Sequence, residues 1–574
     1  MKNVKNLFGM AVMATALVGC SSNDNLNPNA NEGADKAGTA YASFKINLPT
    51  TSGTRAADDG KPTFAEGTAA EYEVKNGTIL IFDNSGKFVE SAELGTMNPW
   101  TKDTDDNGVT TAAAVTVQLH NVKVGTSYKA LVLLNNDVDA TTKKVTLPGV
   151  GDSYYTWSAA VGNANAPKYE STADGIFMAN APKYEATKDP TTLVDLNSVY
   201  ASREQAQANP ATVVYVERGL AKVTMDDFAP NYPINAGTYK GDNVKIVNWQ
   251  LDVTNKYTFP IHQADLKSEW SAVWSEPRFY DNTSSAFKRV YWGTDPNYSG
   301  TDNLTLTNCK NAFNMIGNGD VKGIPGKPQY CLENTFDLDN MKQGQTTRVV
   351  FKAVYTPKTF KSGETFYKIG NNTAIWKKAD LETQIKTLAI KAMKITDLDE
   401  QAMYSVDLTK GSNISGKAGQ HFVAAENIKF DPGESTKTSK VDDGVINEIN
   451  EKLGLSEEDP TTHKEKVGIS TYLNGEAYYI ARIMHFNTLT PWEPGQPTYK
   501  DASLTLDQSN KKYLGRYGVL RNNWYALSVT KISNLGYPEV PEVKPNIPDD
   551  ENDQYINVEV KILDWAKRTQ EIEL

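Results

Sequence analysis

Residues 41–48 read YASFKINL, and their pattern decides the fold class of the chain. Phe44, Ile46 and Leu48 are apolar, and the residues between them are polar. Successive side chains of a β-strand point to opposite faces, so the three apolar residues share one face. The run stops at Pro49. We therefore expect a β-strand with one buried face.

The segment after this strand has a different character. Arg55 follows seven residues after Leu48, inside the stretch TSGTRAADDG at 51–60. Small and polar residues without periodicity are typical of an exposed loop that proteases reach easily. A structural strand is thus joined to the remainder of the chain by a segment suited to cleavage.

The N-terminus predicts export. Residues 1–20 hold two lysines, then an apolar run at 7–18, and end in LVGC. This is a lipoprotein signal peptide, in which Cys20 is acylated and becomes the first residue. The apolar run is too short for the roughly 20 residues that span a bilayer. Residues 21–38 contain almost nothing that packs, which predicts a solvated tether, and Ser22 favours sorting to the outer membrane.

The chain is acidic. It has 59 Lys and Arg against 70 Asp and Glu, a net charge of -11 over 574 residues. Residues 1–55 hold five basic and three acidic side chains, so a product that starts at residue 56 would carry -13. An acidic chain without a basic stripe excludes nucleic acid as a partner. The length predicts two or three domains.

The pattern beyond the loop is mostly β. Short apolar runs alternate with Asn, Asp and Gly turns, which favours β-sandwich domains. The predicted strands lie at 77–82, 87–89, 115–122, 128–134, 244–253, 347–355, 478–483 and 516–532. A longer strand at 213–225 either closes the first domain or crosses to the second.

Two helices interrupt the strands of the second region. Their apolar residues recur at helical spacing and define one face each, and Gly454 is a stop signal after the second helix. The faces consist of Leu381, Ile385, Leu388 and Ala392 in the first helix, and of Val445, Ile449 and Leu453 in the second. We expect these helices to cover a face of a sheet.

The C-terminus carries a strand without an obvious local partner. Residues 537–554 hold four prolines among acids, which predicts a semi-rigid extended linker of up to about 56 Å at roughly 3.1 Å per residue. In residues 555–574, apolar side chains then alternate strictly with polar ones, at Ile556, Val558, Val560 and Ile562. An unpaired strand of this kind is an aggregation hazard.

Candidates for catalysis or metal binding are weak. The five histidines are scattered without metal-ligand spacing or a recognisable acid partner, and no phosphate-binding or nucleophile motif is present. We predict no catalytic residue, no cofactor and no metal site. The sequence leaves open whether Cys309 and Cys331 form a disulfide worth roughly 3 kcal/mol or remain core thiols. Trp270, Trp274 and Trp292 allow either a carbohydrate-stacking surface or core packing.

Taken together, the lipobox, the strand before a cleavable loop, the β-rich body and the C-terminal strand resemble a Bacteroidales fimbrillin, the pilin class of type V pili. The chain is most similar to the stalk subunit of the minor-fimbrium type. The segments that carry the resemblance are LVGC at 17–20, TRA at 54–56, RGLAKVT at 218–224, YCLENT at 330–335, YGVLRNNWY at 517–525, LGYP at 535–538 and VEVKILDW at 558–565 with the closing residues to Leu574.

The resemblance implies a mostly β fold with two transthyretin-like β-sandwich domains, a few short helices and assembly by strand exchange. It implies that an arginine-specific protease cuts between Arg55 and Ala56, which removes the N-terminal strand and opens a groove. The C-terminal strand of a neighbouring copy then fills that groove. The donor residues would be Ile556, Val558, Val560, Ile562, Trp565, Ile572 and Leu574.

This resemblance also implies the domain organisation and the role. The expected parts are a signal peptide at 1–20, a propeptide at 21–55, sandwich domains at 56–225 and 226–536, and a linker with the donor strand at 537–574. A stalk subunit is expected because the chain has both the processing loop and the donor strand. Its partners would be further copies, fimbrial tip and anchor subunits and the protease, at the outer membrane and cell surface. The alternative is a glycan-binding or adhesive, tip-type surface lipoprotein.

Overall fold

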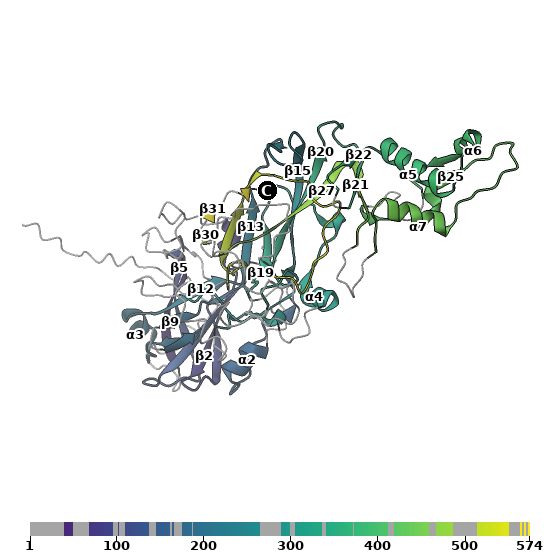
Figure 1. The fold of residues 1–574 in the computed structure, drawn as a ribbon. Helices are drawn as coiled ribbons and strands as arrows, with labels where there is room; N and C mark the ends of the chain where they lie inside the picture. Colours follow the sequence, from purple (N-terminus) through teal and green to yellow (C-terminus); the bar gives the residue numbers. More distant parts are fainter. Residues whose placement is uncertain are drawn as a thin grey trace, which may run out of the picture.

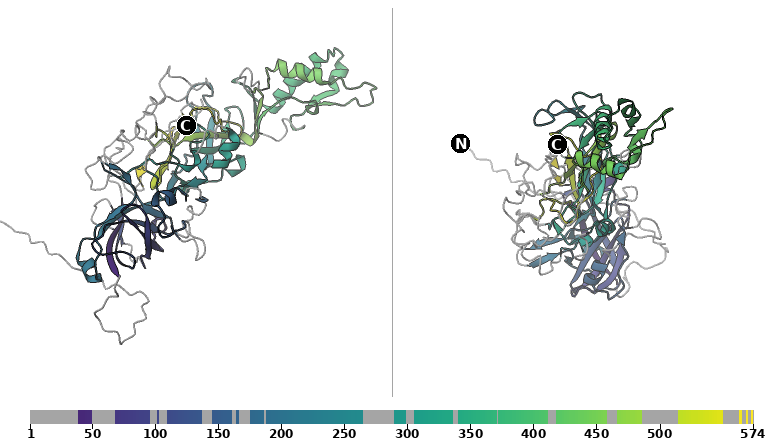
Figure 2. Two further views of the ribbon diagram at one scale, coloured as in Figure 1. Left: turned by 90° about the horizontal axis from the view of Figure 1, so that it is seen from below. Right: turned by 45° about the vertical axis from the view of Figure 1, so that its right-hand side comes forward.

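The structure is a computed structural model, and part of the chain is described in it. The described residues are 39–49, 68–95, 101–102, 109–136, 145–160, 164–165, 175–185, 188–264, 289–298, 305–335, 340–370, 372–410, 418–457, 466–485, 514–549, 563–564, 568–569 and 572–573. They form two β-rich bodies and a helical arm that projects from the second body (Figures 1 and 2). The prediction of a mostly β fold with sandwich-like sheets is confirmed.

The first body is a nine-stranded mixed sheet that includes the N-terminal strand. Its strand order is β3-β2-β6-β8-β12-β1-β5-β4, with β11 paired to β6. The bounds are β1 Ala40–Pro49, β2 Gly77–Asp83, β3 Phe88–Glu93, β4 Thr101–Lys102, β5 Val109–Leu119, β6 Tyr128–Leu134, β8 Met178–Asn180, β11 Val194–Leu196 and β12 Thr212–Arg218. Helices α1 Ala69–Tyr72, α2 Tyr154–Ala160 and α3 Arg203–Ala208 accompany it.

The central strands of this sheet are buried on both faces. In β2, Ile79 and Ile81 face one apolar cluster, and Leu80 and Phe82 face another. The second cluster also contains Leu220, Ile261 and Leu332 of the neighbouring body. The two bodies therefore share apolar packing rather than being tethered by a single linker.

The second body is a sandwich of two sheets. One has the order β19-β13-β28-β30 and the other β14-β15-β20-β27. Their bounds are β13 Leu220–Met225, β14 Tyr232–Pro233, β15 Asn243–Asp252, β19 Gln329–Leu332, β20 Arg348–Thr356, β27 Glu476–Arg482, β28 Asn523–Leu527 and β30 Leu563–Asp564. Val223 and Tyr525 of the first sheet share a core with Trp249 and Phe351 of the second. Helix α4 Leu306–Ala312 lies beside this sandwich.

The predicted strand at 213–225 crosses from one body to the other. It divides into β12 in the first sheet and β13 in the second, with Gly219 between them. Of the two alternatives that the sequence left open, the structure selects the crossing.

The helical arm has its own core. It consists of helices α5 Lys378–Ala392, α6 Leu398–Ala402 and α7 Asp443–Lys452 with strands β21 Phe366–Ile369, β22 Ile375–Trp376, β23 Tyr404–Val406, β24 Gly419–His421, β25 Ile428–Phe430 and β26 Ile469–Tyr472. The two predicted helices exist, and Leu381, Ile385, Val445 and Ile449 are buried as expected. They cover the small sheets of the arm and not the large sheets of the body (Figure 1).

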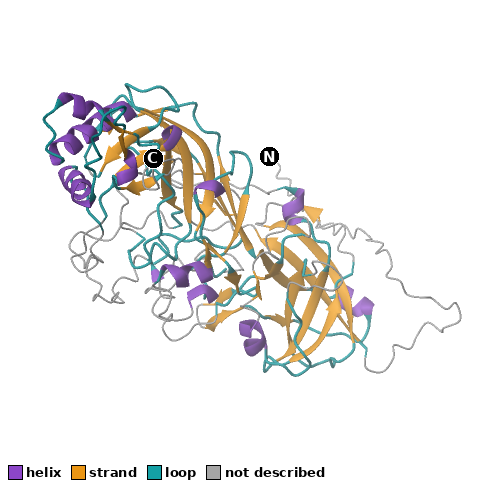
Figure 3. Cartoon of the chain, turned by 90° about the vertical axis from the view of Figure 1, so that its right-hand side faces the viewer, coloured by secondary structure: helices purple, strands orange, loops and turns teal. Residues whose placement is uncertain are grey.

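Short elements complete the described part of the chain. They are β7 Ala164–Asn165, β9 Lys183–Glu185, β10 Lys188–Thr191, β16 Thr254–Asn255, β17 Tyr257–Thr258, β18 Phe313–Asn314, β29 Val529–Lys531, β31 Arg568–Thr569, β32 Ile572–Glu573, η4 Pro296–Tyr298, η6 Asn318–Asp320, η8 Ala425–Asn427 and η9 Leu473–Gly475. Figure 3 shows the helices of the arm gathered at one end of the molecule. Among the described helices, none has the length and apolarity needed to cross a membrane.

Candidate functional site

Strand β1 lies inside the first sheet and not at its edge. It runs antiparallel to β5 over ten residue pairs, from Ala40 opposite Leu119 to Pro49 opposite Val109. On its other side it runs parallel to β12, where Phe44 pairs with Thr212. Its backbone thus joins β5 and β4 to the remainder of the sheet.

The apolar face of β1 fills the core of the first body. Phe44, Ile46 and Leu48 are fully buried, as the alternation in the sequence predicts, and so is Ala42. They pack in the apolar cluster that also holds Val214 and other side chains of the sheet. Full burial of a large apolar side chain stabilises by roughly 1.5 to 3 kcal/mol. The three large residues therefore contribute on the order of 6 kcal/mol before ordering costs.

The opposite face of β1 is not uniformly exposed. Lys45 is exposed and Ser43 is half-buried, but Tyr41 and Asn47 are buried. Among the described residues, none donates a hydrogen bond to the Asn47 side-chain oxygen. This differs from the expected strand with a single buried face, because neighbouring parts of the chain also cover both ends of the outer face.

Removal of β1 would open the sheet at its middle. β5 would lose a partner along most of its length, and β12 would lose its partner for Thr212 to Tyr215. Unpaired strand edges present free N–H and C=O groups that pair readily with another strand. The apolar cluster below would lose one of its walls at the same time. The site is therefore a long groove that β1 closes.

The predicted donor strand falls mostly outside the described residues. Ile556, Val558, Val560, Ile562, Trp565 and Leu574 are not described. Short backbone pieces near the C-terminus are: β30 and β31 pair with β28, and β32, which contains Ile572, pairs with β29. In this single chain, the last part of the C-terminal segment pairs with its own second body.

Most of the predicted linker is docked on the body instead of extending freely. Residues 537–549 run along the second body, where Tyr537 pairs with Tyr478 through two backbone hydrogen bonds. The Arg348 guanidinium donates to the Pro541 carbonyl at 2.7 Å, and Val543 is buried. Proline-rich backbone keeps its carbonyl acceptors, and here buried donors of the body use them. This segment is part of the compact structure, whereas the sequence pattern predicts that the compact part ends at Gly536.

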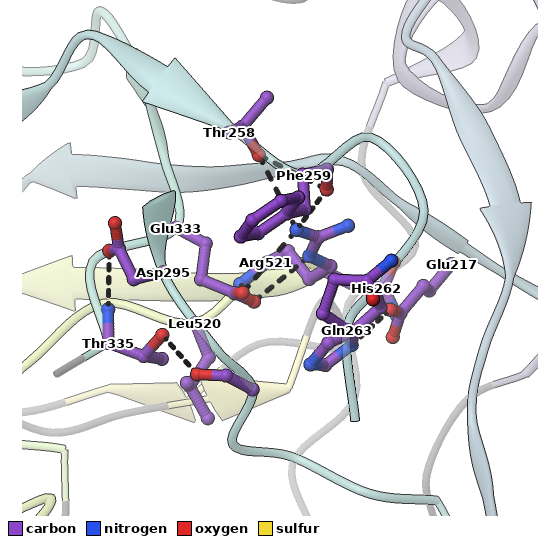
Figure 4. Close-up of polar contacts among 12 residues, drawn as sticks. Glu217, Thr258, Phe259, His262, Gln263, Asp295, Glu333, Thr335, Leu520 and Arg521 are labelled. Atoms are coloured by element: carbon purple, nitrogen blue, oxygen red, sulfur yellow. Dashed lines mark hydrogen bonds and ion pairs between the residues drawn. The ribbon is translucent and has the colours of Figure 1, made fainter. Parts of the chain in front are cut away.

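A network of buried charges lies where the two bodies meet (Figure 4). Glu217, at the end of β12, accepts from Arg289 at 2.6 Å and contacts His262 Nδ1 at 2.7 Å. Nearby, the Arg521 Nε donates to Glu333 at 2.9 Å, and its Nη2 donates to the Phe259 carbonyl at 2.8 Å. We call these five side chains, Glu217, His262, Arg289, Glu333 and Arg521, the buried joint.

The charge state of the carboxyl groups at the buried joint depends on their ion-pair partners. Burial by itself would raise the pKa of Glu217, but Arg289 and His262 outweigh it and lower the pKa to about 2. Asp295 lies close by, and burial raises its pKa to about 7 even though Asn297 and Asn255 donate hydrogen bonds to it. The paired carboxyl therefore stays charged inside the protein, because the neighbouring positive charges favour the carboxylate over the neutral acid.

The two segments RGLAKVT and RNNWY meet beside the buried joint. The Asn522 side-chain oxygen accepts from the backbone N–H of Arg218 at 3.2 Å and from its Nη1 at 3.1 Å. β13 and β28 run parallel, with Lys222 opposite Trp524. The Lys222 ammonium lies 3.6 Å from the centre of the Trp524 ring and forms a 2.7 Å ion pair with Glu71. These contacts tie the sheet of the second body to α1 of the first.

Sequence reasoning missed the joint. The sequence shows no recognisable acid partner for any histidine, but His262 has one in Glu217, which lies 45 residues away in the chain. The available signal was a cluster of charged residues, Glu217, Arg218 and Lys222, within an otherwise apolar strand. Charged side chains inside a buried strand need partners, and only the fold shows which residues supply them.

The remaining predicted residues have simpler outcomes. Cys309 and Cys331 are both buried thiols and lie in different core clusters. Trp292 is fully buried in the cluster that contains Cys309, which fits core packing. Within the described residues, no group of histidine, cysteine and carboxylate side chains has the arrangement of a metal site. Cys20, Arg55, Ala56, Trp270 and Trp274 lie outside the described residues.

Comparison with known proteins gives one family match. Residues 470–571 match the family described as "Major fimbrial subunit protein type IV, Fimbrillin, C-terminal". This range begins in β26 and includes β27, β28 and the C-terminal segment. No curated protein matches the chain. Among solved structures, a fimbrial assembly protein from Parabacteroides distasonis ATCC 8503 is similar, with 13% identity and a TM-score of 0.29 over 59% of this chain and 93% of that chain.

The family match covers less than a fifth of the chain, and it supports similarity of this C-terminal part to fimbrillins. The matched range contains the strand β28 that pairs with Lys222 and the segment that holds Arg521 and Asn522. The residues of the buried joint therefore lie partly inside the region that resembles the fimbrillins.

Proposed function

We propose that the chain is a stalk subunit of a fimbria, exported as a lipoprotein precursor and polymerised by strand exchange. In this proposal Cys20 is lipidated at the outer membrane, and an arginine-specific protease cuts between Arg55 and Ala56. Strand β1 then leaves, and the C-terminal strand of another copy takes its place. Fimbrial tip and anchor subunits would be further partners.

One observation carries the proposal: β1 completes the core of the first body, and along the chain it is joined to the remainder of that body through the segment that contains Arg55. Its residues Phe44, Ile46 and Leu48 are fully buried, and Arg55 follows six residues after Pro49. A single cut at Arg55 separates the strand covalently from the sheet that it completes. A core strand held in this way is suited to replacement.

The C-terminal strand has the composition that such a groove requires. Ile556, Val558, Val560 and Ile562 alternate as the apolar residues of β1 do. Their burial would contribute on the order of 8 kcal/mol before ordering costs, in addition to backbone hydrogen bonds along β5 and β12. Donor and groove are different surfaces of one molecule, so the contact is heterologous and propagates into a filament. A chain with both elements can occupy the middle of a stalk.

The N-terminal residue of the surface protein tests the proposal directly. In the wild type we expect the mature protein to begin at Ala56 and to form ladders on denaturing gels without boiling. An Arg55→Lys variant keeps the charge but removes the arginine-specific site, so we expect an uncut precursor that does not polymerise. Thr54→Ala is the matched control, because it alters the neighbouring residue and should leave both processing and ladders unchanged.

Deletion of residues 555–574 tests the donor. The truncated chain should be cut at Arg55 and remain a folded monomer, because no other copy offers a C-terminal strand that could fill the groove. Filaments that persist in this truncation would refute the role of the C-terminal strand. Mature protein that retains Cys20 with its lipid would refute processing at Arg55.

A further inference from the structure

Arginine and lysine occupy different parts of this molecule. The chain has 10 arginines and 49 lysines. Among the described residues, 22 lysines are exposed, whereas Arg203 is the one exposed arginine. Four further described arginines are buried and two are half-buried, namely Arg218, Arg289, Arg348 and Arg521, and Arg482 and Arg516. Charged side chains of both kinds usually lie at the surface, so the separation needs a physical reason.

Ion pairing explains why the buried cations are arginines. The planar guanidinium forms several hydrogen bonds at once and suits buried carboxylates better than an ammonium does. Arg289 pairs in this way with Glu217, and Arg348 with Asp252 at 2.8 Å. The same reason does not explain why the exposed cations are lysines, because ion pairs at the surface contribute little and either side chain would serve there.

Arg203, the exposed exception, is held by the fold. It is the first residue of α3, and its Nη1 donates to the Thr116 carbonyl at 3.2 Å. Its guanidinium also lies 5.5 Å from the centre of the Tyr41 ring. Proteases cut exposed segments that can leave the folded structure locally, and a helical or paired backbone resists this. Each described arginine is therefore covered at least in part or lies in a helix.

The arm shows the separation most clearly. Residues 366–472 contain 14 lysines and no arginine. Within the arm, residues 431–442 connect β25 to α7 without a helix or strand, and none of them is buried. Lys440 is exposed in this segment, where its ammonium lies 2.7 Å from a Glu400 carboxylate oxygen. The backbone here is open to proteolysis, so the residue types in the segment decide which protease can cut it.

We infer that lysine takes the place of arginine on the exposed surface so that an arginine-specific protease cuts at Arg55 and spares the described parts of the two bodies and the arm. The fold protects the buried arginines, and the choice of residue protects the exposed segments. An arginine in the arm would be cut in the same step that processes Arg55. This inference rests on the proposed function and concerns the selectivity of the processing step.

Limited proteolysis of the folded full-length chain tests the inference. We expect a purified arginine-specific endoprotease to cut after Arg55 and after none of the seven described arginines of the mature chain. A lysine-specific endoprotease should cut the same chain within residues 431–442. Mass spectrometry of the products identifies each site. A wild-type chain that stays uncut at Arg55 would refute the processing step of the proposed function, whereas rapid cuts at the described arginines would overturn the inference alone.

Lys440→Arg separates residue type from structural protection. The variant keeps the positive charge beside Glu400 and adds an arginine to the exposed segment. We expect the arginine-specific enzyme to cut after residue 440 at a rate within about tenfold of the cut after Arg55. On the cell surface, the variant should appear as two fragments that meet at this bond. A Lys440→Arg chain that is cut at Arg55 but stays intact in the arm would overturn the inference and leave the proposed function standing.

Lys245→Arg is the matched control. Lys245 is exposed on β15, where it pairs with Val354 of β20. An arginine at this position is equally exposed, but its backbone is held in the sheet, so we expect no cut there. Equal cleavage of both variants would show that the enzyme acts on unfolded chains, and selectivity by surface residue type would then be refuted.

Discussion

At the scale of the residue, Glu217 shows how a buried charge is kept in this fold. Its carboxylate contacts Arg289 and His262, and Arg521 adds further positive charge. Burial favours the neutral acid, yet the pKa is lowered to about 2 because the three neighbours outweigh burial. The charged form is therefore favoured in the folded protein relative to the unfolded chain.

The lowered pKa of Glu217 predicts acid sensitivity. Its stabilising contribution is present above the ordinary value of 4.5 and is lost as the pH falls from 4.5 towards 2. Glu217→Gln should lower the free energy of unfolding at pH 7 by about 3 kcal/mol, since it leaves Arg289 without its charged partner. It should also flatten the pH dependence between 4.5 and 2. Urea denaturation at a series of pH values measures both effects.

An exposed carboxylate provides the comparison for Glu217. Glu426 is exposed on the arm, so Glu426→Gln should change stability by no more than about 0.5 kcal/mol. An unchanged acid slope in Glu217→Gln would show that other groups govern the acid transition.

At the scale of the element, β1 is a core strand in the precursor and, by our proposal, absent from the filament. Ile46→Ala should destabilise the precursor by about 2 to 5 kcal/mol, because it leaves a cavity in the core of the first body. The mature filament should be unaffected, since cleavage has removed residue 46. Denaturant unfolding of the precursor and heat resistance of the filament measure the two states.

Lys45→Ala is the matched control for β1. Lys45 is exposed on the same strand, and its replacement should change the stability of the precursor by no more than about 0.5 kcal/mol. An equal loss of filament stability in Ile46→Ala would mean that β1 remains in the assembled subunit.

At the scale of the whole molecule, the arm is attached to the second body through two antiparallel strands, β21 and β26. Ile369 of β21 pairs with Ile469 of β26, and the Gly370 N–H donates to the Gly468 carbonyl at 2.9 Å. Replacement of residues 371–467 by Asn-Gly should join the two strands through a two-residue turn. We expect the sandwich to remain folded, because its core and the core of the arm are separate clusters.

Calorimetry measures the effect of this replacement. The variant should lose the part of the unfolding enthalpy that belongs to the arm and retain the transition of the two bodies. If the shortened chain lacks a cooperative transition, the arm is needed for the fold of the sandwich. In the shortened chain, Tyr367 and Ile369 lose the side chains of the arm that cover them and become exposed. This exposure should lower solubility, and replacement of both residues by Thr should restore it.

The alternation in the sequence was enough to predict the strand at 41–48, its inward residues and the mostly β fold. Period-two patterns predict which residues share a face, because the geometry of a strand is local. The same reasoning located α5 and α7 through their helical spacing. It did not predict what those helices cover, since an apolar face does not identify its partner.

Tertiary structure alone decided the features that depend on distant parts of the chain. Asn47 is polar in an alternating pattern, and its burial depends on segments that cover the outer face of β1. Residues 537–549 have the composition of a free linker, but donors such as Arg348 dock them on the body. Arg218 and Asn522 lie 304 residues apart and meet only after the sheet of the second body has formed. Local geometry is encoded locally, whereas burial and charge pairing require the whole chain to be folded.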